Sequence, residues 1–87
     1  MEERSEQREQ DHVLIIEDDE RLAGLTRDYL EANGFRVSLE DDGGRGVDRI
    51  LSLQPDLVIL DLMLPGEDGL SICRRVRSDY GGPILML

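Results

Sequence analysis

Three carboxylates stand directly after continuous apolar runs, and they are the residues of this chain with the clearest chemical potential. Glu17 and Asp18 follow the run Val13–Ile16, and Asp61 follows Leu57–Leu60. Short apolar runs of this kind are typical of buried strands. In open α/β sheets, ligands bind beyond the carboxyl ends of the strands. We therefore expect these three acids to meet at one edge of a sheet.

A cluster of three carboxylates would suit a hard divalent cation and phosphoryl chemistry. Mg²⁺ prefers six oxygen ligands and keeps several waters, so one or two carboxylates suffice, and the backbone carbonyl of Met63 could add another oxygen. A bound divalent ion would change the local charge from about −3 to about −1, which would let a phosphoryl group approach. Asp61 could then act as a nucleophile and form an acyl phosphate.

Other polar residues have structural explanations. Asp19 and Glu20 are favoured at a helix N-terminus, because the helix dipole stabilises negative charge there. Asp68 is interpreted as a helix cap, and His12 as the residue at which a strand begins. Three further acids are expected on the solvated surface: Glu40, Asp42 and Asp48.

The apolar pattern predicts four strands. They are expected at His12–Ile16, Phe35–Leu39, Leu57–Leu60 and Pro83–Leu87. The second of them alternates apolar and polar side chains, which favours a position nearer the sheet edge.

Three helices are predicted between these strands. The first begins at Asp19 or Glu20 and ends at Gly34, which supplies a left-handed stop. Its apolar residues recur three and four positions apart, at Leu22, Leu25, Thr26, Tyr29 and Leu30. The second helix follows a turn at Asp42-Gly43 and must end before Pro55.

The third helix is expected to run from its cap at Asp68 to about Tyr80, where Gly81-Gly82-Pro83 ends it. Strands that alternate with helices of this length predict right-handed βαβ units and a parallel α/β sheet. We expect residues 12–87 to form this domain. Residues 1–11 have no aliphatic side chain beyond Met1, so they are interpreted as a disordered acidic and polar tail.

Composition and charge exclude several classes of function. Twenty acidic residues against ten basic ones give a net charge of −10. Such an acidic segment repels phosphate backbones and is not expected to bind nucleic acid by itself. The single cysteine rules out an internal disulfide and favours a reducing compartment. No signal-peptide core and no apolar stretch near the ~18 residues that span a bilayer are present, so we expect a cytoplasmic protein without membrane attachment.

The two acid-bearing segments resemble the receiver domain of bacterial two-component response regulators. The resemblance rests on Val13–Glu20 and on Leu57–Gly69, which contains the pattern Asp-x-x-x-Pro-Gly-x-x-Gly beginning at Asp61. The order of the two segments and the separation of about forty residues between their acids add to the match. The resemblance covers residues 12–87 and is strongest to the OmpR-like transcriptional regulators, with Leu64–Leu87 similar to the RstA type.

The resemblance implies a flavodoxin-like, doubly wound parallel sheet, here incomplete, with strand order 2-1-3-4. It implies that Asp61 accepts phosphate from a sensor histidine kinase. Asp18 would bind Mg²⁺ directly, Glu17 would bind it through water, and Met63 would contribute its backbone carbonyl. A non-enzymatic signalling role follows, with a receiver–receiver dimer as a further partnership and DNA reached only through a separate output domain.

The family also has features that this chain does not contain. A Thr or Ser normally ends the fourth strand, and the chain stops at Leu87, the position before it. A Lys normally ends the fifth strand, and the chain has no Lys. We therefore expect an acid site without its usual readout. The strand Pro83–Leu87 is expected to form an uncovered edge that favours self-association.

Two other functions stay open at this stage. A Mg²⁺-dependent phosphohydrolase also uses an Asp nucleophile at a strand tip, but such enzymes usually place a second Asp two residues later, where this chain has Met63. The other alternative is a non-catalytic fragment that pairs with intact receivers through its sheet edge. One stable phosphoryl adduct on Asp61 would favour the receiver, and repeated turnover of a phosphoester would favour the hydrolase.

Overall fold

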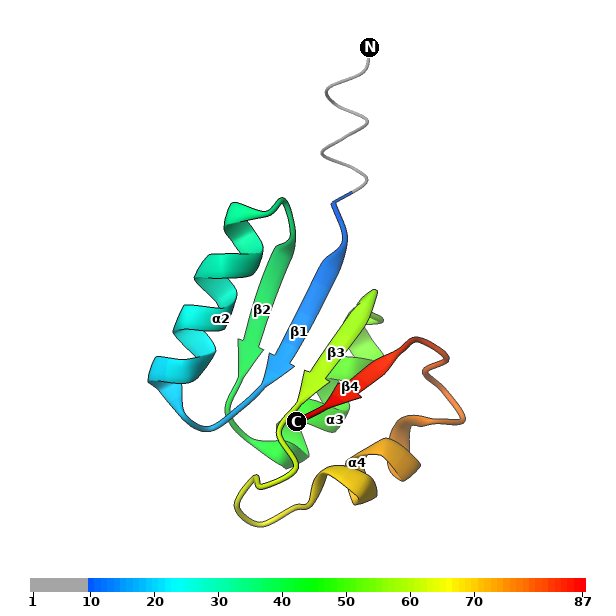
Figure 1. The fold of residues 1–87 in the computed structure, drawn as a ribbon. Helices are drawn as coiled ribbons and strands as arrows, with labels where there is room; N and C mark the ends of the chain where they lie inside the picture. The colour runs from blue at the N-terminus through cyan, green and yellow to red at the C-terminus, as the bar shows by residue number, and fades with distance from the viewer. Residues whose placement is uncertain (1–9) are drawn as a thin grey trace.

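The structure is a computed structural model that describes residues 10–87, in which strands and helices alternate (Figure 1). Of the tail expected at residues 1–11, residues 1–9 lie outside the described part. The strands are β1 (His12–Ile16), β2 (Arg36–Glu40), β3 (Leu57–Leu60) and β4 (Ile84–Met86). The helices are α2 (Glu20–Ala32), α3 (Gly43–Leu53) and α4 (Gly69–Val76).

The strands form one parallel sheet in the order β2-β1-β3-β4. The continuous apolar sequence of β1 fits its central place, because a central parallel strand is buried on both faces. The parallel register pairs Ile16, the last residue of β1, with Glu40 of β2 and Leu60 of β3. The doubly wound α/β fold and the strand order 2-1-3-4 are confirmed.

Helices lie on both faces of the sheet, with α3 and α4 on one side and α2 on the other (Figure 1). Successive strand residues point to opposite faces, so β1 supplies both layers. The smaller cluster, on the α2 side, is Val13, Ile15 and Ile59, with Leu30 and Phe35 packed against it. The larger core, beneath α3 and α4, is Leu14, Ile16, Val47, Ile50, Val58, Leu60, Leu64, Ile72, Val76 and Tyr80.

Each helix begins at an aspartate that caps it. Asp19, Asp42 and Asp68 each accept the backbone amide three residues on, at 3.1, 2.8 and 2.9 Å respectively. These bonds satisfy donors that the first helical turn leaves unpaired. The predicted start of the first helix and the cap at Asp68 are confirmed, and Asp42 is a cap as well as an exposed residue.

The apolar stripe predicted α2 correctly, but three of its five residues are exposed. Leu22, Leu25 and Tyr29 are 48%, 60% and 69% exposed. The helix instead packs on β1 and β2 through the buried Ala23 and through Leu30. Leu22 and Thr26 of the stripe line a small pocket together with Ile59 of β3.

The third helix ends earlier than predicted, at Val76 and not at about Tyr80. The Arg77 guanidinium donates to the carbonyls of Tyr80 and Gly82, both at 3.0 Å, and so stabilises a turn at this point. Tyr80 is still buried, and its hydroxyl donates to the Pro55 carbonyl at 2.8 Å. The turn buries the Tyr80 ring and gives its hydroxyl a hydrogen bond, and we infer that this is why the chain leaves the helix after Val76.

Two strand boundaries also differ from the predictions. β2 lies one residue later than Phe35–Leu39, because the Phe35 amide donates to the Leu30 carbonyl and closes the end of α2. β4 is confined to the middle of the predicted Pro83–Leu87. Both differences are small, and neither changes which residues follow β1 and β3.

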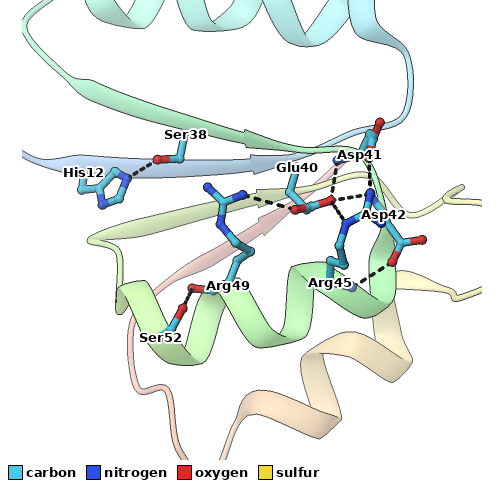
Figure 2. A network of polar contacts seen from close by, with 8 residues as sticks. All are labelled: His12, Ser38, Glu40, Asp41, Asp42, Arg45, Arg49 and Ser52. Atoms are coloured by element: carbon cyan, nitrogen blue, oxygen red, sulfur yellow. Dashed lines mark hydrogen bonds and ion pairs between the residues drawn. The ribbon is translucent and has the colours of Figure 1, made fainter.

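His12 is the first residue of β1, as predicted, and it is buried. Its Nε2 lies 2.7 Å from the Ser38 hydroxyl (Figure 2). Its backbone amide donates to the Asp56 carboxylate at 2.7 Å. Burial lowers the pKa of the imidazole, and Arg36 and Arg49 lower it further, while Asp56 opposes them. The neutral imidazole is therefore the form that fits the fold.

We predict that His12 makes the fold more stable at neutral pH than in mild acid. Its folded pKa lies below the ordinary value of 6.5, so the unfolded state binds the proton more tightly. This contribution is complete above that ordinary value and is lost as the pH falls through the folded pKa. The free energy of urea unfolding should therefore fall more steeply with acidification for the wild type than for His12→Gln. Parallel pH curves for the two proteins would contradict the prediction.

Candidate metal centre

The carboxylates of Glu17, Asp18 and Asp61 lie together at the carboxyl end of the sheet. One oxygen from each residue lies within 4.8 Å of the others. Glu17 and Asp61 are half-buried, and Asp18 is exposed. Among residues 10–87, no other group of acidic, His or Cys side chains has metal-ligand spacing.

Backbone hydrogen bonds just past the strand ends hold the two acid-bearing segments in place. The Asp61 amide donates to the Ile16 carbonyl at 3.0 Å. The Glu17 amide donates to the Glu40 carbonyl at 2.9 Å. Both acids thus continue the parallel ladder by one residue, so their positions follow from the register of β1 with its two neighbours.

Two of the three carboxylates are also oriented by the chain that follows them. Glu17 Oε2 accepts the Asp19 amide at 3.1 Å, and Asp61 Oδ1 accepts the Met63 amide at 2.9 Å. A carboxylate has lone pairs for about four hydrogen bonds, so each side chain keeps oxygen sites for a cation. In both cases the backbone amide two residues after the acid orients its carboxylate and leaves other oxygen lone pairs available for a cation.

The cluster is electrostatically unfavourable when it holds only negative charge. Burial raises the pKa of the Glu17 carboxyl most, and contact with Asp61 and the charge of Asp18 raise it further, while the bond from the Asp19 amide lowers it. Three carboxylates at this separation repel one another, and a cation between them removes that repulsion.

The residues present fit Mg²⁺. The donor set is entirely carboxylate oxygen, on a partly open surface that leaves room for retained waters. Such an ion, when bound, neutralises the oxygens of an incoming phosphoryl group. Receiver domains bind Mg²⁺ in general; for this chain, the separate roles of Asp18, Glu17 and the Met63 carbonyl stay predictions.

The loop after Asp61 depends on two glycines. Gly66 has a φ of +81°, a left-handed conformation that other residues rarely adopt. A Cβ on Gly69 would lie 2.8 Å from Leu62 Cδ2 and 3.3 Å from Leu62 Cα, so a larger residue there would force Leu62 to shift. The first turn of α4 is thereby kept beside the acid-bearing end of β3.

Glu40, which was expected on the solvated surface, is instead buried, and that expectation was wrong. Its side chain is 6% exposed and accepts hydrogen bonds from two backbone amides and from the guanidinium groups of Arg45 and Arg49 (Figure 2). The four donors offset the cost of burying a carboxylate. The available signal was the pair of arginines one helical turn apart, on the helix that follows the strand.

A doubly wound sheet with carboxylates at the carboxyl ends of its central strands places these acids where open α/β folds bind their ligands. The family model for the response regulator receiver domain matches residues 13–87 of this chain. The chain belongs to the response regulator receiver domain family. This confirms the family, and with it the link to two-component systems that the acid-bearing segments indicated.

The chain is similar to transcriptional regulators. It is 43% identical over 79 residues to the transcriptional regulatory protein CseB of Streptomyces avermitilis, covering 91% of this chain and 34% of that protein. It is 41% identical over 75 residues to the transcriptional regulatory protein RstA of Escherichia coli, covering 86% and 31%. The chain therefore spans about one third of the length of these relatives. Both are OmpR-family regulators, which confirms the placement among OmpR-like proteins.

Solved receiver domains share the fold. The BeF3-activated N-terminal receiver domain of Klebsiella pneumoniae RstA superposes with a TM-score of 0.82 at 38% identity, covering 87% of this chain and 65% of that one. A putative response regulator of Chloroflexus aurantiacus gives a TM-score of 0.82 at 33% identity, covering 90% and 66%.

Within residues 10–87, no helix has the length and apolar character needed to cross a membrane.

We predict that Mg²⁺ binding weakens as the pH falls, and that Glu17 carries part of this dependence. Metal binding requires deprotonated ligands. Because the pKa of Glu17 is raised above its ordinary value of 4.5, protons compete with the cation at a higher pH than for an isolated carboxyl. Calorimetric titration should show affinity falling from neutral pH toward that value, with a shallower fall in Glu17→Gln. An equal pH dependence in both proteins would contradict this role.

Proposed function

We propose that this chain is the phosphoacceptor part of a two-component response regulator, with Asp61 receiving a phosphoryl group from a sensor histidine kinase. The observation that carries the proposal is the approach of the Glu17, Asp18 and Asp61 oxygens to within 4.8 Å. That spacing suits one cation held beside a half-buried aspartate. A match of the family model to residues 13–87 supports the same role.

In the proposed step, a carboxylate oxygen of Asp61 forms a bond to phosphorus as the bond from phosphorus to the kinase imidazole breaks. The electron pair of the broken bond stays on the imidazole nitrogen, which takes a proton from solvent. Asp61 becomes an acyl phosphate. The hydrogen bond from the Met63 amide engages Asp61 Oδ1, which leaves the second oxygen to attack phosphorus.

The other acids have separate roles in this proposal. Asp18 binds Mg²⁺ directly, Glu17 binds it through water, and the Met63 carbonyl completes the protein ligands. The ion supplies charge neutralisation for the phosphoryl oxygens. The modified Asp61 gains nearly two negative charges, and that change in local charge is the signal.

The wider assignment follows from the relatives. CseB and RstA are transcriptional regulatory proteins by name, and we propose that this segment likewise controls a DNA-binding output domain that it does not itself contain. It would act in the cytoplasm as a stoichiometric switch and not as an enzyme. Receiver–receiver dimerisation is part of the proposal, and direct nucleic-acid or membrane binding by this segment is not.

We predict a single phosphoryl adduct on Asp61. The protein, incubated with Mg²⁺ and a small acyl phosphate donor, should gain one phosphoryl group by intact mass measurement, and Asp61→Asn should gain none. Asp68→Asn is the matched control, because its amide oxygen can still cap α4 and it leaves the acid cluster unchanged. Omitting Mg²⁺ should abolish the adduct in the wild type.

Other outcomes of that experiment assign the chain differently. Repeated turnover of a phosphoester without a stable adduct would identify a phosphohydrolase and refute the receiver role. Binding of Mg²⁺ without any adduct would leave a non-catalytic interaction module. An adduct that persists in Asp61→Asn would move the phosphoacceptor to another residue.

A further inference from the structure

The buried carboxylate of Glu40 lies at the end of β2, beside the acid cluster. It accepts the amides of Asp41 and Asp42 at 3.1 and 3.0 Å. It also accepts Arg45 Nε at 3.1 Å and Arg49 Nη1 at 3.3 Å. Figure 2 shows both arginines reaching from α3 toward this one carboxylate.

Capping α3 does not explain this arrangement. Asp42 already caps the helix by accepting the Arg45 amide at 2.8 Å. The two amides that Glu40 accepts belong to the turn between β2 and α3, so its side chain fixes that turn. With two cationic partners on α3, it also ties the end of β2 to the helix that covers it.

The end of β2 is in direct contact with the acid cluster. The Glu40 carbonyl accepts the Glu17 amide at 2.9 Å, and the Glu17 carboxylate is one of the three clustered acids. A groove of about 480 Å³ joins the two regions, with Glu17, Glu40 and Arg45 among its walls. The backbone of Glu40 is therefore bonded directly to the backbone that carries Glu17.

We propose that Glu40, held by Arg45 and Arg49, is a positioning residue for the Mg²⁺ site, because it fixes the strand end whose carbonyl orients Glu17. The inference rests on the proposed function, in that it assigns Mg²⁺ to the acid cluster. Removing one guanidinium leaves a buried carboxylate with too few donors, which favours its movement toward water. The turn and the end of β2 would move with it.

Arg45→Gln tests this proposal by the sign of its effect. A guanidinium near the three acids repels Mg²⁺, so its loss would by electrostatics alone make Mg²⁺ bind more tightly. A positioning role predicts the opposite: affinity measured by calorimetry should fall roughly tenfold, the lower end of the loss seen when supporting partners of metal ligands are removed.

Arg27→Gln is the matched control. Arg27 lines the same groove and pairs with the exposed Asp28, not with Glu40. Its replacement removes the same charge without touching the Glu40 contacts, so Mg²⁺ binding should stay unchanged or become tighter. If Arg45→Gln does not fold, Arg49→Gln removes the other guanidinium and is expected to show the same loss.

A metal-free measurement accompanies the titration. Amide hydrogen exchange at Glu17 should accelerate about tenfold in Arg45→Gln, because the bond to the Glu40 carbonyl opens more often. The Asp61 amide, which donates to Ile16, should keep its wild-type rate and serves as the internal reference.

Unchanged or tighter Mg²⁺ binding by Arg45→Gln overturns the proposal, whatever the exchange rates show. Equal losses in Arg45→Gln and Arg27→Gln overturn it as well, because the loss of affinity would then not depend on the contacts of Glu40. A wild-type chain that binds Mg²⁺ but forms no adduct on Asp61 refutes the proposed function alone, since the affinity comparison uses no phosphodonor. A wild type that binds no Mg²⁺ refutes both.

Discussion

The parallel pairing of β1 with β3 is the constraint on which the rest of this structure depends. Ile16 lies opposite Leu60, so the residues that follow them, Glu17 and Asp61, leave the sheet side by side. A slip of one residue would turn every side chain of a strand to the other face. The apolar side chains of both strands oppose such a slip because they are buried in the two core clusters. Burial in the core therefore fixes the separation of two acids that lie outside it.

Bringing carboxylates together costs free energy, and the chain offsets part of that cost locally. The amides of Asp19 and Met63 each donate to an acid two residues before them, which orients Glu17 and Asp61. Burial raises the pKa of Glu17 most, and the neighbouring Asp61 and Asp18 raise it further. The negative charge of the cluster attracts a divalent cation, and in the proposed function the charge of that cation would in turn attract a phosphoryl group.

Much of this fold was predictable because its signals are local. Apolar runs predicted the strands, and an aspartate before a helical pattern predicted the cap at Asp68, which depends only on neighbouring residues. The predictions failed where distant contacts decide. The end of α4 depends on a buried bond from Tyr80 to Pro55, and the exposure of Leu22, Leu25 and Tyr29 depends on which side of α2 meets the sheet.

The sequence by itself determined that Glu17, Asp18 and Asp61 follow buried strands, because four apolar residues before an acid are recognisable without any partner. It also determined the family, through the spacing of those acids and the loop that follows Asp61. Only the tertiary structure decided the burial of Glu40. Its charge is compensated by arginines from another element, and their reach depends on how α3 packs against β2. From sequence alone, a buried acid with cationic partners cannot be distinguished from an exposed one, because its partners come from other elements.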